Sequence, residues 1–202
     1  AGVQSMSAIP MGGLNPMLNV NVQDGNAAGF MNMGITAENL AEIYGISRED
    51  QDGFAVESNQ KTAAAQAKGH FKNEIVPING VDADDGARAD STVEGLGKLR
   101  TVFKDVKEGG TVTAANASQV TDGASAVMVT SEAFAEANSL PVKAIILGYG
   151  EASLKPEVMG LGPVDASKEA LSRAGLKMSD IDVVELNEAF AAQSIAVLKE
   201  FE

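Results

Sequence analysis

The chain has 202 residues, of which 45% are hydrophobic and only 4% aromatic, so its core must be built mainly from aliphatic side chains. Its formal net charge of −13 argues against a nucleic-acid groove or an anionic membrane surface, because both require clustered cations. Cysteine is absent and histidine occurs once, which argues against disulfides, thiolate metal sites and a Ser-His-Asp triad within this chain. With no long apolar run and no signal-peptide pattern, we expect a soluble cytoplasmic protein.

The two ends of the sequence lack the signals that usually bound a folded element. It opens with "AGVQSMSAIPMGG", which has no leading element, and it stops at "AVLKEFE" within a helical pattern. No Gly or Asn stop signal follows that pattern. We therefore expect the chain to be a piece of a longer protein.

The first third of the chain predicts helices after an irregular segment. Residues 8–30 are rich in Gly, Asn, Met and Pro and show no clear period. Thr36 is placed to cap a first helix that stops at Gly45. Ser47 begins a capping-box pattern that opens a long helix, and Gly69 ends it.

The middle of the chain mixes short strands and short helices. Residues 73–78 predict an edge strand, and Ser91 begins a second capping-box pattern before a short helix. The apolar run 127–129 predicts a buried strand, and Ser131 is placed to cap the helix after it. The single histidine, His70, is expected in a surface loop.

From residue 142 the pattern alternates between apolar runs and helices. Runs 142–150 and 181–186 predict strands, each followed by a helix, and the first helix has Pro163 near its start and Gly175 just past its end. Continuous apolar strands are typical of a parallel sheet that helices cover on both faces. We therefore predict a layered α/β protein with a mainly helical insertion at about residues 11–110.

Asn187 follows the predicted strand 181–186 directly. Ligand sites in such sheets lie at the carboxyl ends of strands, which favours a functional role. An asparagine at this corner would also serve as an N-cap of the next helix. The residue pattern alone leaves both roles open.

At this point the sequence resembles the thiolases, the acyl-CoA C-acyltransferases. The segment "LNEAFAAQ" (186–193) is similar to their Asn-Glu-Ala-Phe signature. The resemblance continues in order through residues 3–13 ("VQSMSAIPMGG"), 32–78 (from "NMGITAENL" to "IVPI"), 110–129 ("GTVTAANASQVTDGASAVMV") and 159–182 ("MGLGPVDASKEALSRAGLKMSDID"). It implies part of a layered α-β-α-β-α fold. The end of the N-terminal core domain would be residues 1–10 and 111–140, the substrate-covering loop domain 11–110, and the start of the C-terminal core domain 141–202.

The resemblance also implies a reaction. Thiolases cleave 3-ketoacyl-CoA with CoA, or condense two acetyl-CoA to acetoacetyl-CoA, through a nucleophilic cysteine, a second cysteine and a histidine in a Gly-His-Pro motif. None of these three residues is in this chain. We therefore expect the isolated chain to be inactive, and a fragment that only binds CoA or dimerises is the alternative. Asn187 argues against the related ketosynthases, which generally have histidine at that position.

Site residues carry over from the family position by position. Asn187 would hold an ordered water in an oxyanion hole, and the other implied residues would contact the acyl or CoA part of the substrate. These are Met33 near the acyl end of the substrate, Ala189 and Phe190 along the narrow tunnel for its acyl and pantetheine parts, Ala114 and Ser118 near pantetheine, and Arg88 near the adenine or phosphate end of CoA. No metal is implied, and coenzyme A or acyl-CoA enters as substrate, not as a permanent cofactor. The full-length protein is expected to be a homodimer, with a tetramer as the alternative.

Overall fold

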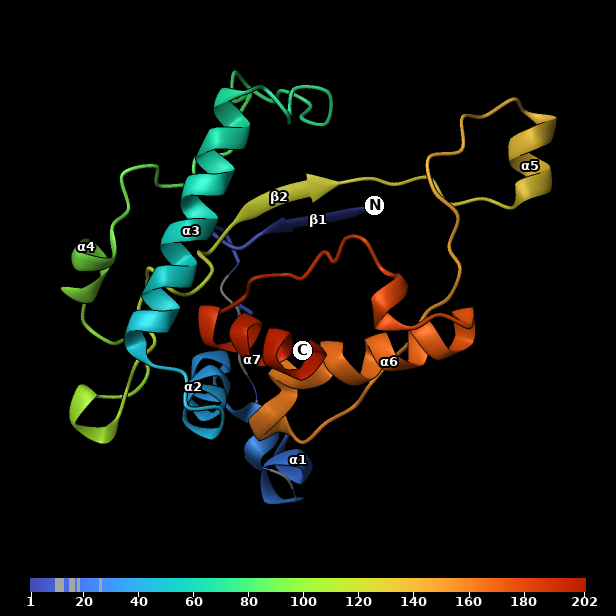
Figure 1. The fold of residues 1–202 in the computed structure, drawn as a ribbon. Helices are drawn as coiled ribbons and strands as arrows, with labels where there is room; N and C mark the ends of the chain where they lie inside the picture. Colours follow the sequence, from blue (N-terminus) through green and yellow to red (C-terminus); the bar gives the residue numbers. More distant parts are fainter. Residues whose placement is uncertain (10–12, 15–16, 18, 26) are drawn as a thin grey trace.

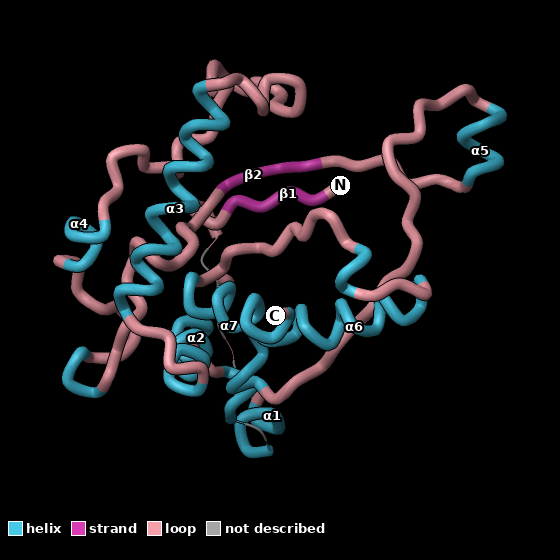
Figure 2. Tube along the Cα trace, in the orientation of Figure 1, coloured by secondary structure: helices cyan, strands magenta, loops and turns pink. Residues whose placement is uncertain are grey.

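The structure is a computed structural model that describes residues 1–9, 13–14, 17, 19–25 and 27–202 (Figures 1 and 2). Much of the predicted irregular segment 8–30 therefore lies outside the described residues. The helices are α1 (Val20–Gly25), α2 (Met33–Ile43), α3 (Arg48–Ala67), α4 (Val93–Gly97), α5 (Glu132–Ala137), α6 (Gly162–Ala174) and α7 (Ala191–Phe201). Short 3₁₀ helices cover Ala27–Phe30, Val106–Glu108, Pro156–Leu161 and Met178–Asp180. The strands are β1 (Gly2–Ser5) and β2 (Asp122–Ser125).

The sheet is an antiparallel pair of β1 and β2, whose register runs from Gly2 opposite Ser125 to Ser5 opposite Asp122. Beyond this end of the pair, the Ser7 backbone N–H donates to Asp122 Oδ1 at 2.9 Å. The sequence predicted a strand at the apolar run 127–129, but strand β2 ends at Ser125, just before that run. The prediction that this run is buried is wrong, because its side chains are 72–79% exposed.

The other predicted strands are also wrong for the described chain. Residues 142–150 and 181–186 are in neither helix nor strand and form no strand ladder with other described residues. A strand exists only through hydrogen bonds to a neighbour, so an apolar run without a paired neighbour stays irregular. In the region of 73–78, the structure shows a single bridge between Ile78 and Val81. The intervening Asn79 and Gly80 both have positive φ, as a two-residue hairpin turn requires.

The core lies where α2 meets α7. Leu40, Ala41 and Ile46 pack there against Ala192 and Ala196, all at most 4% exposed. Alanines on both helices let the two backbones approach closely, in agreement with the expected aliphatic core. Helix α3 contacts both α4 and α7. Figure 1 shows α5 at the end of long extended connections, away from these helices.

The predicted boundary residues of three helices are confirmed in detail. At the start of α3, Ser47 Oγ accepts from the Asp50 backbone N–H, and Asp50 Oδ2 accepts from the Ser47 backbone N–H, both at 3.0 Å. The helix ends before Gly69, whose φ of 73° is left-handed. Helix α6 likewise has a proline in its first turn and the left-handed Gly175 as its C-cap. The predicted cap Ser131 accepts from the Phe134 backbone N–H of α5.

Two other predicted caps are wrong by one or a few residues. Asn32 caps α2 by accepting from the Gly34 backbone N–H at 2.8 Å, whereas Thr36 lies inside the helix. The Thr36 hydroxyl donates instead to the Met33 carbonyl. At α4 the cap is Thr92 rather than Ser91, because Thr92 Oγ1 accepts from the Gly95 backbone N–H. In both cases a polar residue nearby in sequence takes the role.

A buried carboxylate on α2 holds the chain that enters the site. Glu38 is 3% exposed and accepts hydrogen bonds from the backbone N–H groups of Thr111 and Val112 and from the Thr111 hydroxyl. These donors solvate the carboxylate in place of water, which makes its burial tolerable. The contact fixes residues 111 and 112 against the helical insertion.

Candidate functional site

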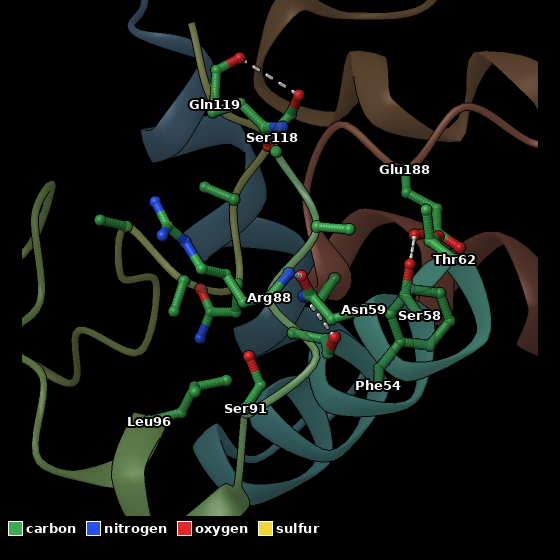
Figure 3. A pocket seen from close by; sticks show the side chains of 18 of the residues that line it. Phe54, Ser58, Asn59, Thr62, Arg88, Ser91, Leu96, Ser118, Gln119 and Glu188 are labelled. Atoms are coloured by element: carbon green, nitrogen blue, oxygen red, sulfur yellow. Dashed lines mark hydrogen bonds between the residues drawn. The ribbon is translucent and has the colours of Figure 1, made fainter. Parts of the chain in front are cut away.

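A cavity of about 540 Å³ lies between α3 and four groups of residues from other parts of the chain (Figure 3). Its lining comes from Phe54, Ala55, Ser58, Asn59 and Thr62 of α3, from residues 85–88 and Ser91, from Leu96 and Leu99, from residues 114–119, and from Glu188 and Ala191. The size is within the range of small-molecule and cofactor sites. The lining mixes apolar groups with hydroxyls, amides and charges.

Three of the residues predicted for the site gather in this cavity: Arg88, Ala114 and Ser118. The Arg88 backbone N–H donates to Asn59 Oδ1 at 2.8 Å, which ties the segment of residues 85–88 to α3. The Arg88 side chain is exposed and brings a positive charge to the cavity lining. Figure 3 shows Arg88, Asn59 and Ser118 around the same opening.

Residues 187–191, which we call the corner segment, run beside residues 116–118. The Ser118 backbone N–H donates to the Ala189 carbonyl at 2.8 Å, and the Ala191 backbone N–H donates to the Asn116 carbonyl at 2.9 Å. Phe190 forms a bridge with Ala117 between these two contacts. The corner segment is therefore held beside residues 116–118 up to the first residue of α7.

This arrangement shows that Asn187 is not the cap of the last helix. Helix α7 begins at Ala191, and its N-cap is Phe190, which contributes no side-chain cap hydrogen bond. The predicted helix start near residue 188 was too early, because residues 189–191 pair with residues 116–118. Asn187 is exposed, two residues before the first of these contacts.

Met33, Ala189 and Phe190 do not line the cavity; all three are half-buried. Phe190 packs edge-on against Phe103, with ring centroids 6.1 Å apart and an interplanar angle of 76°. Phe103 also lies against Gly34, the neighbour of Met33 at the start of α2. Of the predicted site residues, Arg88, Ala114 and Ser118 thus line the cavity, whereas the others, Asn187 among them, lie outside its lining.

The sequence reasoning missed Ser58, Asn59 and Glu188. Ser58 Oγ donates to Glu188 Oε2 at 2.5 Å and connects α3 to the corner segment (Figure 3). Phe54, Ser58 and Thr62 are four residues apart on α3, so they share one helix face. This polar-apolar stripe and the position of Glu188 beside Asn187 were the available signals.

The described residues show neither a cluster suited to a metal ion nor a helix suited to span a membrane. No three of their His, Asp or Glu side chains form a group able to hold a metal ion. No helix in the described part of the chain is long and apolar enough to cross a membrane. His70, predicted in a surface loop, is exposed beyond the end of α3.

Comparison with known proteins finds two family matches. Residues 1–133 match the thiolase N-terminal domain, and residues 140–202 match the thiolase C-terminal domain. An acetyl-CoA acetyltransferase of Chromobacterium violaceum is 47% identical in an alignment of 195 positions that covers 91% of this chain and 49% of that protein. A 3-ketoacyl-CoA thiolase of Pseudoalteromonas translucida is 46% identical in an alignment of 211 positions that covers 98% of this chain and 53% of that protein.

A solved structure agrees with these sequence matches. Human mitochondrial 3-ketoacyl-CoA thiolase superposes with a TM-score of 0.82 at 43% identity, over 87% of this chain and 45% of that chain. The same human protein in complex with CoA superposes equally well. The chain spans about half the length of the curated relatives it matches.

Proposed function

Given that this chain belongs to the thiolase family, we propose that the protein containing it is an acyl-CoA C-acyltransferase. Its reaction is the cleavage of 3-ketoacyl-CoA by CoA, or the reverse condensation of two acetyl-CoA to acetoacetyl-CoA. The single observation that carries the proposal is the cavity between α3 and residues 114–119, beside the corner segment that bears Asn187. The names of the relatives and the human complex with CoA support the substrate class.

The cavity has the chemistry to hold a CoA thioester. CoA carries phosphates at one end and an amide-bearing pantetheine arm at the other. We propose that Arg88 faces the phosphate or adenine end, because a guanidinium matches phosphate oxygens. We further propose that Ala114 and Ser118 border the pantetheine arm and that Met33 borders the acyl end. Ala189 and Phe190 would line the tunnel that holds the acyl and pantetheine parts of the substrate.

Asn187 takes the catalytic role in this proposal. Its amide would hold a water that stabilises the thioester enolate oxygen, a task for which a neutral donor group is suited. This chain contains no cysteine, so the proposal requires a nucleophilic cysteine that these 202 residues do not supply. Domain boundaries at 11–110 and 141–202, a homodimer and a cytoplasmic location stay predictions of the sequence.

The proposal is tested by following the loss of acetoacetyl-CoA when CoA is added to the whole protein. We expect cleavage by the whole protein and none by the isolated 202-residue chain. Arg88→Gln should raise the KM for CoA, whereas Arg100→Gln, an exposed arginine outside the cavity lining, should not. A whole protein that cleaves no 3-ketoacyl-CoA would refute the proposal, and binding of CoA without cleavage would favour the non-catalytic alternative.

A further inference from the structure

A buried polar pair joins the helical insertion to the corner segment. Asp52 of α3 is 1% exposed, and Asn116 is 3% exposed. Asp52 Oδ1 accepts from Asn116 Nδ2 at 3.0 Å, and Asp52 Oδ2 accepts from Arg48 Nε at 2.7 Å. The Asp52 carboxylate is therefore held by Asn116 at one oxygen and by Arg48 at the other. The Arg48 guanidinium is itself fixed, because it also donates to the Leu96 carbonyl at 2.6 Å.

The Asn116 side chain uses both its donor and its acceptor within the protein. Its Oδ1 accepts from the Thr113 backbone N–H at 2.7 Å, and its Nδ2 also donates to the Thr111 carbonyl at 3.3 Å. These bonds fix the turn of residues 111–116. The backbone carbonyl of Asn116 is thereby aimed at the Ala191 N–H, 2.9 Å away.

This chain of contacts ends at the segment that carries Asn187. Asn187 itself is exposed and lies on an irregular stretch. The Glu188 side chain beside it accepts from Ser58, and the nearest backbone hydrogen bonds in sequence are those of Ala189 and Ala191. Both are made by residues 116–118. A catalytic amide loses much of its effect when it is displaced by about 1 Å.

We infer that Asp52 and Asn116 are positioning residues for Asn187, acting through the hydrogen bonds between residues 116–118 and 189–191. The inference rests on the proposed function of Asn187 in an oxyanion hole. Neither residue needs to touch the reacting atoms. Their role is to keep the corner segment in one place relative to the cavity.

The experiment is a double-mutant cycle on the whole protein, with kcat and KM measured for acetoacetyl-CoA cleavage. Asn187→Ala should lower kcat about 100- to 1,000-fold, as the loss of an oxyanion donor does. Asn116→Ala should lower kcat about 10-fold, with little change in KM, because the lost interaction acts on the transition state. In the Asn187→Ala background, Asn116→Ala should lower kcat no further.

The KM of Asn116→Ala distinguishes a positioning role of Asn116 from direct contact with the substrate. Asn116 belongs to the cavity lining, so a loss of substrate contact would raise KM and leave kcat nearly unchanged. Hydrogen exchange provides a second measurement, since Asn116→Ala should speed exchange in a peptide that spans residues 187–193. If Asn116→Ala does not fold, Asp52→Asn keeps the shape of the side chain and takes its place in the same cycle.

Val164→Ala is the matched control. Val164 of α6 is 4% exposed, about as buried as Asn116, but it belongs neither to the cavity lining nor to the hydrogen bonds between residues 116–118 and 189–191. Its truncation should lower thermal stability and leave kcat and the exchange of residues 187–193 unchanged. If Val164→Ala lowers kcat as much as Asn116→Ala, the effect is general destabilisation and the inference fails.

Two further outcomes separate this inference from the proposed function. Multiplicative losses in the double variant would show that Asn116 acts independently of Asn187, which overturns the inference and leaves the proposed function standing. An unchanged kcat in Asn187→Ala would remove the proposed role of Asn187 and this inference together.

Discussion

Gly34 is the position at which a single added methyl group would disturb the aromatic pair beside the corner segment. An ideal Cβ on Gly34 would lie 2.2 Å from Cγ and Cδ2 of Phe103, whose ring packs against Phe190. The ring would have to move, and overpacking of this kind costs about 1–3 kcal/mol. We therefore expect Gly34→Ala to lower the free energy of unfolding by that amount, measured by urea denaturation.

Gly53 provides the opposite case in another helix. It lies in the interior of α3, and a Cβ there would meet nothing within 4 Å. Gly53→Ala should raise the free energy of unfolding by about 0.5–1 kcal/mol, because alanine restricts the unfolded chain and favours the helix. Equal effects of the two substitutions would show that Phe103 yields freely to the added methyl group.

The residues of the candidate site show what a sequence pattern can and cannot supply. Arg88, Ala114 and Ser118 were assigned through a family resemblance, and the structure places all three on one cavity. Ser58 was missed because its contact partner, Glu188, is 130 positions away in the chain. Nothing local to either residue signals that hydrogen bond.

At the scale of elements, the capping box of α3 predicts a pH-dependent contribution to stability. Hydrogen bonds from the Ser47 hydroxyl and then from the Ser47 backbone lower the pKa of Asp50 below its ordinary value. A lowered pKa means that the folded state favours the carboxylate, so this stabilisation is present above about pH 3.9 and is lost as the pH falls further. Ser47→Ala should therefore destabilise the protein at neutral pH, by about 1 kcal/mol for the lost cap.

The difference between wild type and Ser47→Ala should shrink when unfolding is measured below about pH 3.9. Thr92→Ala is the control, since Thr92 caps α4 with Gly95 as its partner and no carboxylate bonds back to it. Its cost should be the same at both pH values. A pH-independent loss for Ser47→Ala would mean that the Asp50 carboxylate contributes nothing to the cap.

Helices and strands differ in how far the sequence could predict them. The boundaries of α3 and α6 follow from caps and glycines within a few residues, and they were predicted correctly. The runs 142–150 and 181–186 are as apolar as buried strands, but a strand also needs a hydrogen-bonded neighbour, which local sequence does not supply. The start of α7 was misplaced for the same reason, because residues 189–191 pair with residues distant in the chain.

At the scale of the whole molecule, apolar side chains are concentrated on extended segments outside the helical core. Residues 127–129 are 72–79% exposed, and Ile145, Ile146 and Leu147 are 67–74% exposed. Val183 is 75% exposed on a third such segment. Apolar side chains exposed in runs of this kind favour association with other apolar surfaces, and backbone outside helices and sheets offers free hydrogen-bonding groups.

We therefore expect the isolated 202-residue chain to self-associate as its concentration rises and to bind the dye 8-anilinonaphthalene-1-sulfonate. Ile146→Lys places a charge in the middle of one apolar run, so it should reduce both association, measured by light scattering, and dye fluorescence. Val106→Lys is the control, because Val106 is 66% exposed but stands between Asp105 and Lys107 instead of within an apolar run. A chain that stays monomeric and binds no dye over the same concentrations would show that these segments cover one another in solution.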